Sequence, residues 1–169
     1  MKESRIFPES EAREPFSMAF EAVEANDLVA LEANLSDVKL RDEDGRTLLH
    51  VSAANGHAAL VRRLLEAGAE VSTKDDGGWT PLLSSSSAGA MPIVAMLLEA
   101  KADVNASADG GLTALLAASG KGHIDVVNAL LAAGAKLDAR DRQGLPSIAR
   151  AVASGRLEVW VENKEYEYH

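Results

Sequence analysis

The stretch from Asp42 to Thr73, DEDGRTLLHVSAANGHAALVRRLLEAGAEVST, decides the fold, because the chain restates its pattern further downstream. Four of its features, a turn glycine, a threonine, a leucine pair and a second glycine, recur at a constant interval of 33 residues. Independent positions that keep one interval indicate a structural repeat unit. The equivalent residues are Gly45, Gly78, Gly111 and Gly144; Thr47, Thr80 and Thr113; Leu64–Leu65, Leu97–Leu98 and Leu130–Leu131; and Gly56, Gly89, Gly122 and Gly155.

Each unit predicts a turn followed by two helices. Residues 42–45 form the turn, and Thr47 can cap the first helix with its hydroxyl. That helix ends near Asn55–Gly56, and the second runs over residues 58–67, with apolar residues three and four apart on one face. Gly68 can adopt the left-handed conformation that stops a helix. The sequence therefore predicts an all-α solenoid of helix-turn-helix units with protruding turns.

The same pattern divides the chain. Residues 16–41 have apolar residues at helical spacing, and Asn26 takes the place of Gly56, which predicts an N-terminal cap of two helices. Residues 1–15 are polar and hold two prolines, so we expect a flexible arm. The predicted boundaries are 1–15 for the arm; 16–161 for the repeat domain, with its cap at 16–41, full repeats at 42–74, 75–107 and 108–140, and a partial terminal repeat at 141–161; and 162–169 for a polar tail.

Composition and charge exclude several classes of partner. Lys plus Arg number 17 against 26 Asp plus Glu, a formal charge of −9, so we expect no nucleic-acid partner and no anionic membrane surface. There is no cysteine, which excludes disulfides and thiolate metal sites. No apolar run has the length of a signal h-region or a membrane span. We expect a soluble, monomeric protein of the cytoplasm, with the nucleus as a second location.

The sequence motifs do not indicate catalytic activity. His50, His57 and His123 fall at positions that the repeat explains, and the fourth histidine is the terminal His169. There is no metalloprotease, P-loop or serine-hydrolase motif, and the glycine pairs in the turns are flanked by aspartates that would repel a phosphate. We therefore expect no enzyme activity, no cofactor and no metal. His50, in the run Thr47-Leu48-Leu49-His50, is assigned the structural role of linking one turn to the next.

The second repeat departs from the pattern at two places. Residues 84–87 are four serines inside a predicted helix, and Lys101 replaces the glycine found at Gly68 and Gly134. Small volume on a packed face explains the serines better than a phosphorylation tract. A non-glycine residue in the left-handed conformation costs about 1 kcal/mol. We expect this repeat to be the least stable of the full ones.

Candidate partner-binding residues fall into three groups. Acidic residues at the exposed turn tips should align into an acidic edge, which would attract a basic partner or remain a solvated surface. The residues after the turn glycines should form a row on the concave side, where Trp79 is the best candidate contact and packing of its ring on a neighbouring turn is the equal alternative. The tips are Glu43, Asp44, Asp76 and Asp109; the row is Arg46, Trp79, Leu112 and Leu145; and Asn55, Lys121 and Arg142 extend the surface.

The first aspartate of each turn has a different assignment. Asp42, Asp75 and Asp141 each stand at the first turn position, where a short acceptor can bond nearby backbone N–H groups. We therefore assign these three carboxylates a structural role.

With these motifs the chain resembles the ankyrin-repeat family over roughly residues 16–161. The resemblance implies antiparallel helix pairs joined by protruding turns, a concave face that binds another protein, and no common catalytic activity. The implied function is that of a protein-protein interaction module.

A narrower resemblance rests on Lys74-Asp75-Asp76-Gly77-Gly78-Trp79-Thr80-Pro81-Leu82 and on Glu162-Asn163-Lys164-Glu165. Both segments resemble gankyrin-type assembly chaperones of the proteasome regulatory particle. That resemblance implies a proteasomal ATPase subunit as partner, contacted by Arg46, Trp79 and Lys121. Such proteins have about seven repeats, whereas this chain stops in its fifth. A binding inhibitor of a kinase and a generic adaptor or scaffold are the alternatives.

Overall fold

The computed structural model describes residues 15–35 and 37–137, and this part of the chain is entirely helical apart from turns and loops. Two isolated β-bridges, Arg41 with Thr47 and Ser107 with Thr113, close the bases of the first and third turns. The predicted all-α solenoid is confirmed. Its helices are α1 (Pro15–Glu24), α2 (Leu28–Asn34), α3 (Leu48–Ala54), α4 (Ala58–Glu66), α5 (Pro81–Ala88), α6 (Met91–Glu99), α7 (Ala114–Lys121) and α8 (Ile124–Ala132).

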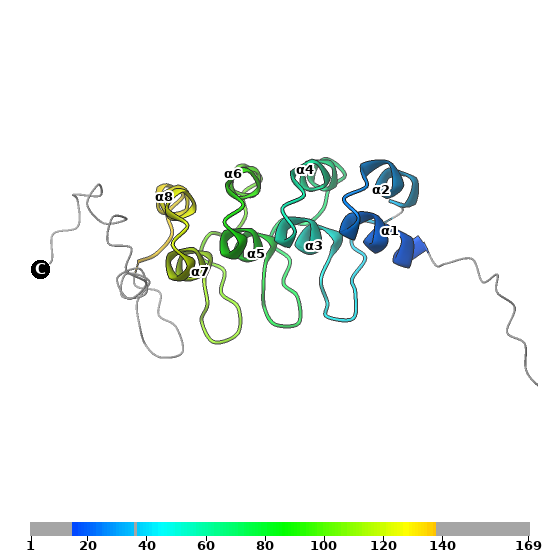
Figure 1. Cartoon of the computed structure of the whole chain (residues 1–169). Helices are drawn as coiled ribbons and strands as arrows, with labels where there is room; N and C mark the ends of the chain where they lie inside the picture. The colour runs from blue at the N-terminus through cyan, green and yellow to red at the C-terminus, as the bar shows by residue number, and fades with distance from the viewer. Residues whose placement is uncertain (1–14, 36, 138–169) are drawn as a thin grey trace, which may run out of the picture.

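The helices form two parallel rows (Figure 1). The inner row consists of α1, α3, α5 and α7, and the outer row of α2, α4, α6 and α8. Each inner helix packs against its outer partner and against the next inner helix. The turns project beside the inner row, so the inner helices and the turns together make one side of the molecule.

Helix starts and stops follow the repeat chemistry. The hydroxyls of Thr80 and Thr113 accept hydrogen bonds from the third residue of α5 and α7, at 3.2 and 3.3 Å. A left-handed residue then ends each inner helix, which is glycine in the full repeats and Asn26 in the cap, with φ of 55°. Asn26 therefore occupies the conformation that its alignment with Gly56 predicted.

The core contains aliphatic side chains and small residues. Fully buried leucines recur on both helices of each repeat, among them Leu49, Leu64, Leu82 and Leu97. On α5, which packs against both α3 and α7, Ser85 and Ser86 are also completely buried. Small side chains allow these neighbouring backbones to approach closely, which is the reason that the sequence offered for the serines.

The turns stack through hydrogen bonds that repeat with the period of the sequence. Asp76 N–H donates to the carbonyl of Asp44, and Asp109 N–H donates to the carbonyl of Gly77, each at 3.0 Å. One residue before each of the first two turns, a basic side chain reaches into the next repeat. Arg41 Nη1 donates to the carbonyl of Lys74 at 2.9 Å, and Lys74 Nζ donates to that of Ser107 at 2.7 Å. These bonds hold the turn tips in register.

The second repeat contains the backbone conformation that the sequence predicted. Lys101 has φ of 66°, beside 84° for Gly68 and 91° for Gly134 at the equivalent positions. A side chain in this conformation is strained because its Cβ approaches the following carbonyl oxygen. The free-energy cost of this strained conformation therefore falls on the second repeat, because the neighbouring repeats have glycine at the equivalent position.

The structure describes only the last residue of the predicted arm and none of the predicted partial repeat or tail. Helix α1 begins at Pro15, which the sequence had placed in the arm, because proline is well tolerated in the first helical turn. The rest of the arm, the partial repeat at 141–161 and the tail at 162–169 lie outside the described residues. Within the described helices, none is long and apolar enough to cross a membrane.

Candidate functional site

An open groove of about 650 Å³ lies on the concave side, between the inner helices and the first two turns. Its lining comes from α1, α3, α5, the end of α7 and both turns. The lining residues are Glu24, Asp44, Arg46, His50, Val51, Ala54, Asn55, Asp75, Asp76, Gly77, Trp79, Ser84, Ser87, Ala88 and Lys121.

The repeat explains why these residues meet. Arg46 and Trp79 occupy one equivalent position, and Asn55, Ala88 and Lys121 occupy another. Because stacked repeats align equivalent positions, residues far apart in the chain line one surface. The groove is thus a product of the stacking and belongs to no single repeat.

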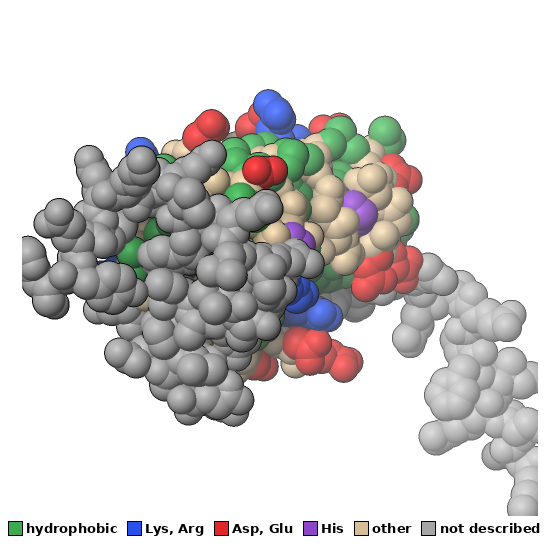
Figure 2. All heavy atoms as spheres, turned by 60° about the vertical axis from the view of Figure 1, so that its left-hand side comes forward, with side chains coloured by type: hydrophobic (Ala, Val, Ile, Leu, Met, Phe, Trp, Pro, Cys, Tyr) green, Lys and Arg blue, Asp and Glu red, His purple; other side chains and the backbone are tan. Residues whose placement is uncertain are grey.

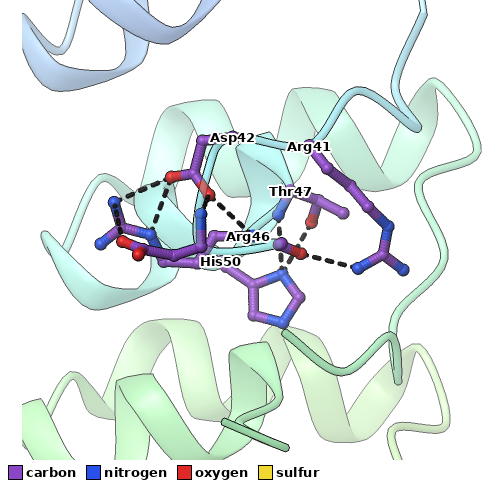
Figure 3. A network of polar contacts seen from close by, with 7 residues as sticks. Arg41, Asp42, Arg46, Thr47 and His50 are labelled. Carbon is purple, nitrogen blue, oxygen red and sulfur yellow. Dashed lines mark hydrogen bonds and ion pairs between the residues drawn. The ribbon is translucent and has the colours of Figure 1, made fainter. Parts of the chain in front are cut away.

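In the first turn, the Asp42 carboxylate organises the backbone (Figure 3). Its Oδ1 accepts from the N–H groups of Asp44 and Arg46 at 3.1 and 2.8 Å. In the second turn, Asp75 Oδ1 accepts in the same way from Gly77 and Trp79 at 3.0 and 2.8 Å. The structural role predicted for Asp42 and Asp75 is confirmed, and Asp141 lies outside the described residues.

The guanidinium of Arg46 is held by its own turn. Its Nε donates to Asp42 Oδ2 at 2.8 Å, and its Nη2 lies 2.8 Å from Asp42 Oδ2 and 3.2 Å from Asp44 Oδ2. Figure 3 shows these contacts on one side of the turn. Arg46 therefore lines the groove with its positive charge already matched by two carboxylates, which sequence reasoning did not foresee.

His50 joins the first repeat to the second. Its Nδ1 accepts a hydrogen bond from Thr47 N–H at 3.1 Å and lies 2.8 Å from Thr47 Oγ1, while Nε2 lies 3.0 Å from the carbonyl oxygen of Trp79. Because a backbone N–H can only donate, Nδ1 must be the acceptor and Nε2 must carry the proton. Burial lowers the pKa of the imidazole below its ordinary value of 6.5, so the ring is neutral at neutral pH. The predicted linking role is confirmed.

Trp79 has a fixed backbone and a half-buried side chain. Its N–H donates to Asp75 and its carbonyl accepts from His50. The indole lies against its own turn, since a Cβ at Gly77 would sit 3.4 Å from Trp79 Cδ1, and the ring also lines the groove. The turn that the ring contacts is therefore its own and not the neighbouring one that the sequence offered as the alternative.

The predicted contact residues divide into four groups. Asp44, Arg46, Asn55, Asp76, Trp79 and Lys121 line the groove. Glu43 is exposed and lines an adjoining hollow of about 330 Å³. Asp109 and Leu112, from the third turn, are not among the residues that line either space, and Arg142 and Leu145 lie outside the described residues.

Leu112 stays a predicted contact residue that lies outside this groove. Its side chain is half-buried, and it lies one repeat beyond Trp79, the last turn residue to line the groove. Sequence reasoning in turn missed Glu24, at the end of α1, which lines both the groove and the hollow. Its signal was available, since aligning Asn26 with Gly56 places Glu24 opposite Ala54.

Acidic groups predominate around the groove. Glu24, Asp44, Asp75 and Asp76 line it, against two cationic side chains, Arg46 and Lys121. Figure 2 shows acidic side chains at the lower edge of the visible face, on the side where Figure 1 draws the turns. The surface offers a concave shape, an aromatic ring and an excess of negative charge.

Comparison with protein-family models identifies the repeat. A model of ankyrin repeats in three copies matches residues 19–108, and a second ankyrin-repeat model matches residues 86–131 and 115–159. A search of curated proteins finds no match.

Proposed function

The chain belongs to the ankyrin repeat family, and we propose that it binds a partner protein through the groove formed by its inner helices and first two turns. Members of this family typically act as non-catalytic binding modules. The observation that carries the proposal is the place of Trp79, which lines the groove on a backbone held by three hydrogen bonds. Tryptophan is among the residues that most often dominate binding energy in protein interfaces.

The groove is pre-organised for binding. Asp42 and Asp75 bond the backbone of their turns, and His50 connects the turns across the repeat boundary. A surface that is already ordered loses little conformational entropy when a partner arrives. These residues support the partner-binding role through the shape that they maintain.

The proteasomal ATPase remains the first partner to test, since residues 74–82 carry the narrower resemblance. Much of that segment serves the fold itself. Lys74 bonds Ser107, Asp75 bonds its own turn and Thr80 caps α5. Trp79 is thus the member of this segment best placed to contact a partner, while Glu162–Glu165 lie outside the described residues.

The experiment compares Trp79→Ala with Leu112→Ala. The two residues hold equivalent positions, and only Trp79 lines the groove. Each variant is used for affinity capture from a eukaryotic lysate and for calorimetry with a purified proteasomal ATPase C-terminal domain. We expect Trp79→Ala to weaken partner binding by more than about 1 kcal/mol, with helical content unchanged by circular dichroism.

Three other outcomes have distinct meanings. Unchanged binding by Trp79→Ala would refute the groove as the binding surface. Equal loss of helical content and binding would make Trp79 structural. Capture of a kinase or another protein in place of the ATPase would favour the inhibitor or adaptor alternative.

A further inference from the structure

Two carboxylates at the groove have no cationic partner among the residues that the structure describes. Among the described residues, ion pairs join Arg46 to Asp42 and Asp44, Lys39 to Glu70, and Arg63 to Glu32. Glu24 and Asp76 take part in none of these pairs, and both are exposed. They come from different elements, α1 and the second turn, yet line the same groove as Trp79.

The other charged groups do not neutralise this surface. The charge of Arg46 is matched by Asp42 and Asp44, and the buried imidazole of His50 is neutral. Lys121 lies at the far end of the groove, on α7, whereas Glu24 lies on α1. The hollow that continues the groove beside α1 has five acidic residues and one basic residue in its lining. Negative charge therefore extends from the groove toward the N-terminal end of the solenoid.

A groove lined by an aromatic ring and by carboxylates has a definite chemical preference. A guanidinium stacks on an indole through its planar face while its N–H groups donate to carboxylates. An ammonium group makes the ion pair but lacks the planar stacking surface and the fork of donors. The combination of Trp79, Asp76 and Glu24 thus favours arginine over lysine.

We propose that the groove binds an extended basic segment of the partner protein, with an arginine stacked on Trp79 and paired with the carboxylates of Asp76 and Glu24. This inference rests on the proposed partner-binding function and specifies the chemistry of that partner. The net charge of −9 assists by attracting a basic segment from a distance. The neutral, hydrogen-bonded His50 keeps the floor of the groove free of competing positive charge.

The test uses a fluorescent peptide of alternating arginine and serine, acetylated and amidated at its ends, and a lysine-serine peptide of equal length. Binding to the full chain is measured at low ionic strength by fluorescence anisotropy. The groove variant is Glu24→Gln with Asp76→Asn. The control, Glu66→Gln with Glu99→Gln, makes the same charge change at exposed positions of the outer helices α4 and α6.

We expect the groove variant to bind the arginine peptide about tenfold more weakly, and the control variant to change affinity by less than about twofold. The arginine peptide should bind the unmodified chain more tightly than the lysine peptide. Equal weakening by both variants would overturn the inference, because it would show only general attraction to an acidic protein. No binding of the arginine peptide, or a preference for lysine, would overturn it as well.

Affinity capture with the Trp79→Ala variant and with the groove variant distinguishes failure of this inference from failure of the proposed function. If Trp79→Ala abolishes capture while the groove variant retains full binding, the basic-segment inference fails and the partner-binding function stands. If capture survives both changes, the function itself fails. Loss of capture with the groove variant, but not with the outer-helix control, supports both.

Discussion

The junction between the first and second repeats and the junction between the second and third use the same architecture with different polar chemistry. In both, an inner helix packs on the next, and a backbone hydrogen bond of 3.0 Å ties one turn to the next. At the first junction, His50 adds a buried link to the carbonyl of Trp79. The equivalent position of the second repeat holds Leu83, which is completely buried.

The difference separates what every repeat needs from what one repeat adds. Apolar packing and the backbone bond between turns occur at both junctions and follow the period of the sequence. The link from His50 to the Trp79 carbonyl and the two aspartate-organised turns occur at the first junction. At the second junction, His123 Nε2 lies 3.2 Å from the Ser87 carbonyl oxygen, and Ala108 replaces the aspartate of the third turn. The groove lies over the first junction, so the candidate site lies where aspartates organise the turns and His50 joins them.

The largest expected effect tests the apolar packing that both junctions share. Leu49→Ala and Leu82→Ala each remove a fully buried side chain at an equivalent position of α3 and α5. Each should lower the free energy of unfolding by about 3 kcal/mol, because the lost packing leaves a cavity. Urea denaturation followed by circular dichroism measures both. A loss confined to one variant would show that the junctions do not share their hydrophobic stabilisation.

The next effect tests the link from His50 to the Trp79 carbonyl at the first junction. His50→Leu introduces at the first junction a leucine, the residue that occupies the equivalent position as Leu83. The Trp79 carbonyl and the Thr47 N–H then lose their side-chain partner, which should cost about 1–3 kcal/mol. The same urea experiment gives the value. Stability equal to or above that of the unmodified chain would mean that the histidine link is dispensable.

A smaller effect concerns the repeat that both junctions share. Lys101→Gly should raise the free energy of unfolding by about 1 kcal/mol, because glycine adopts φ of 66° without the strain that a side chain suffers. The neighbouring Ala100→Gly is the matched control, since Ala100 has φ of −74° and gains nothing from glycine. A loss of stability in both variants would contradict the assignment of strain to Lys101.

The smallest effect is the pH dependence of the first junction. Burial lowers the pKa of His50 in the folded chain, so the unfolded chain binds this proton more readily. The contribution of His50 to stability is therefore complete above pH 6.5 and decreases as the pH falls from 6.5 toward the lower pKa of the folded chain. Unfolding of the unmodified chain and of His50→Leu is compared from neutral to mildly acidic pH. An identical slope for both chains would contradict this assignment.

Local chemistry was predictable where it depends on nearby residues. The threonine of the repeat predicted a helix cap, and Thr80 caps α5. The first aspartate of the turn predicted an acceptor for backbone N–H groups, and Asp75 is such an acceptor. The replacement of glycine by Lys101 predicted a non-glycine residue in the left-handed backbone conformation. These features are set within a few residues of the chain, which is why the pattern sufficed. The repeat interval then extended them to the solenoid, because equivalent helices must bury equivalent faces.

The composition of the groove was less predictable. Trp79 and Lys121 were expected to face one surface and do line one groove, whereas Leu112, expected in the same row, does not line that groove. Glu24 joined the site from the cap, and Arg46 formed ion pairs within its own turn. Distances between side chains of different repeats decide which residues join the groove, and periodicity specifies positions without specifying side-chain directions.

The sequence by itself determined the helix pairs, the turn register and the identity of the linking histidine, because each depends on local propensity or on the period. Only the tertiary structure decided which carboxylates keep an unpaired charge. Asp42 and Asp44 lie within reach of Arg46, whereas Glu24 and Asp76 lie on the same groove with no described cation in ion-pair range. Coulomb attraction falls with distance. The contacts of Arg46 form within one turn, whereas Glu24 and Asp76 come to line one groove only once the repeats have stacked.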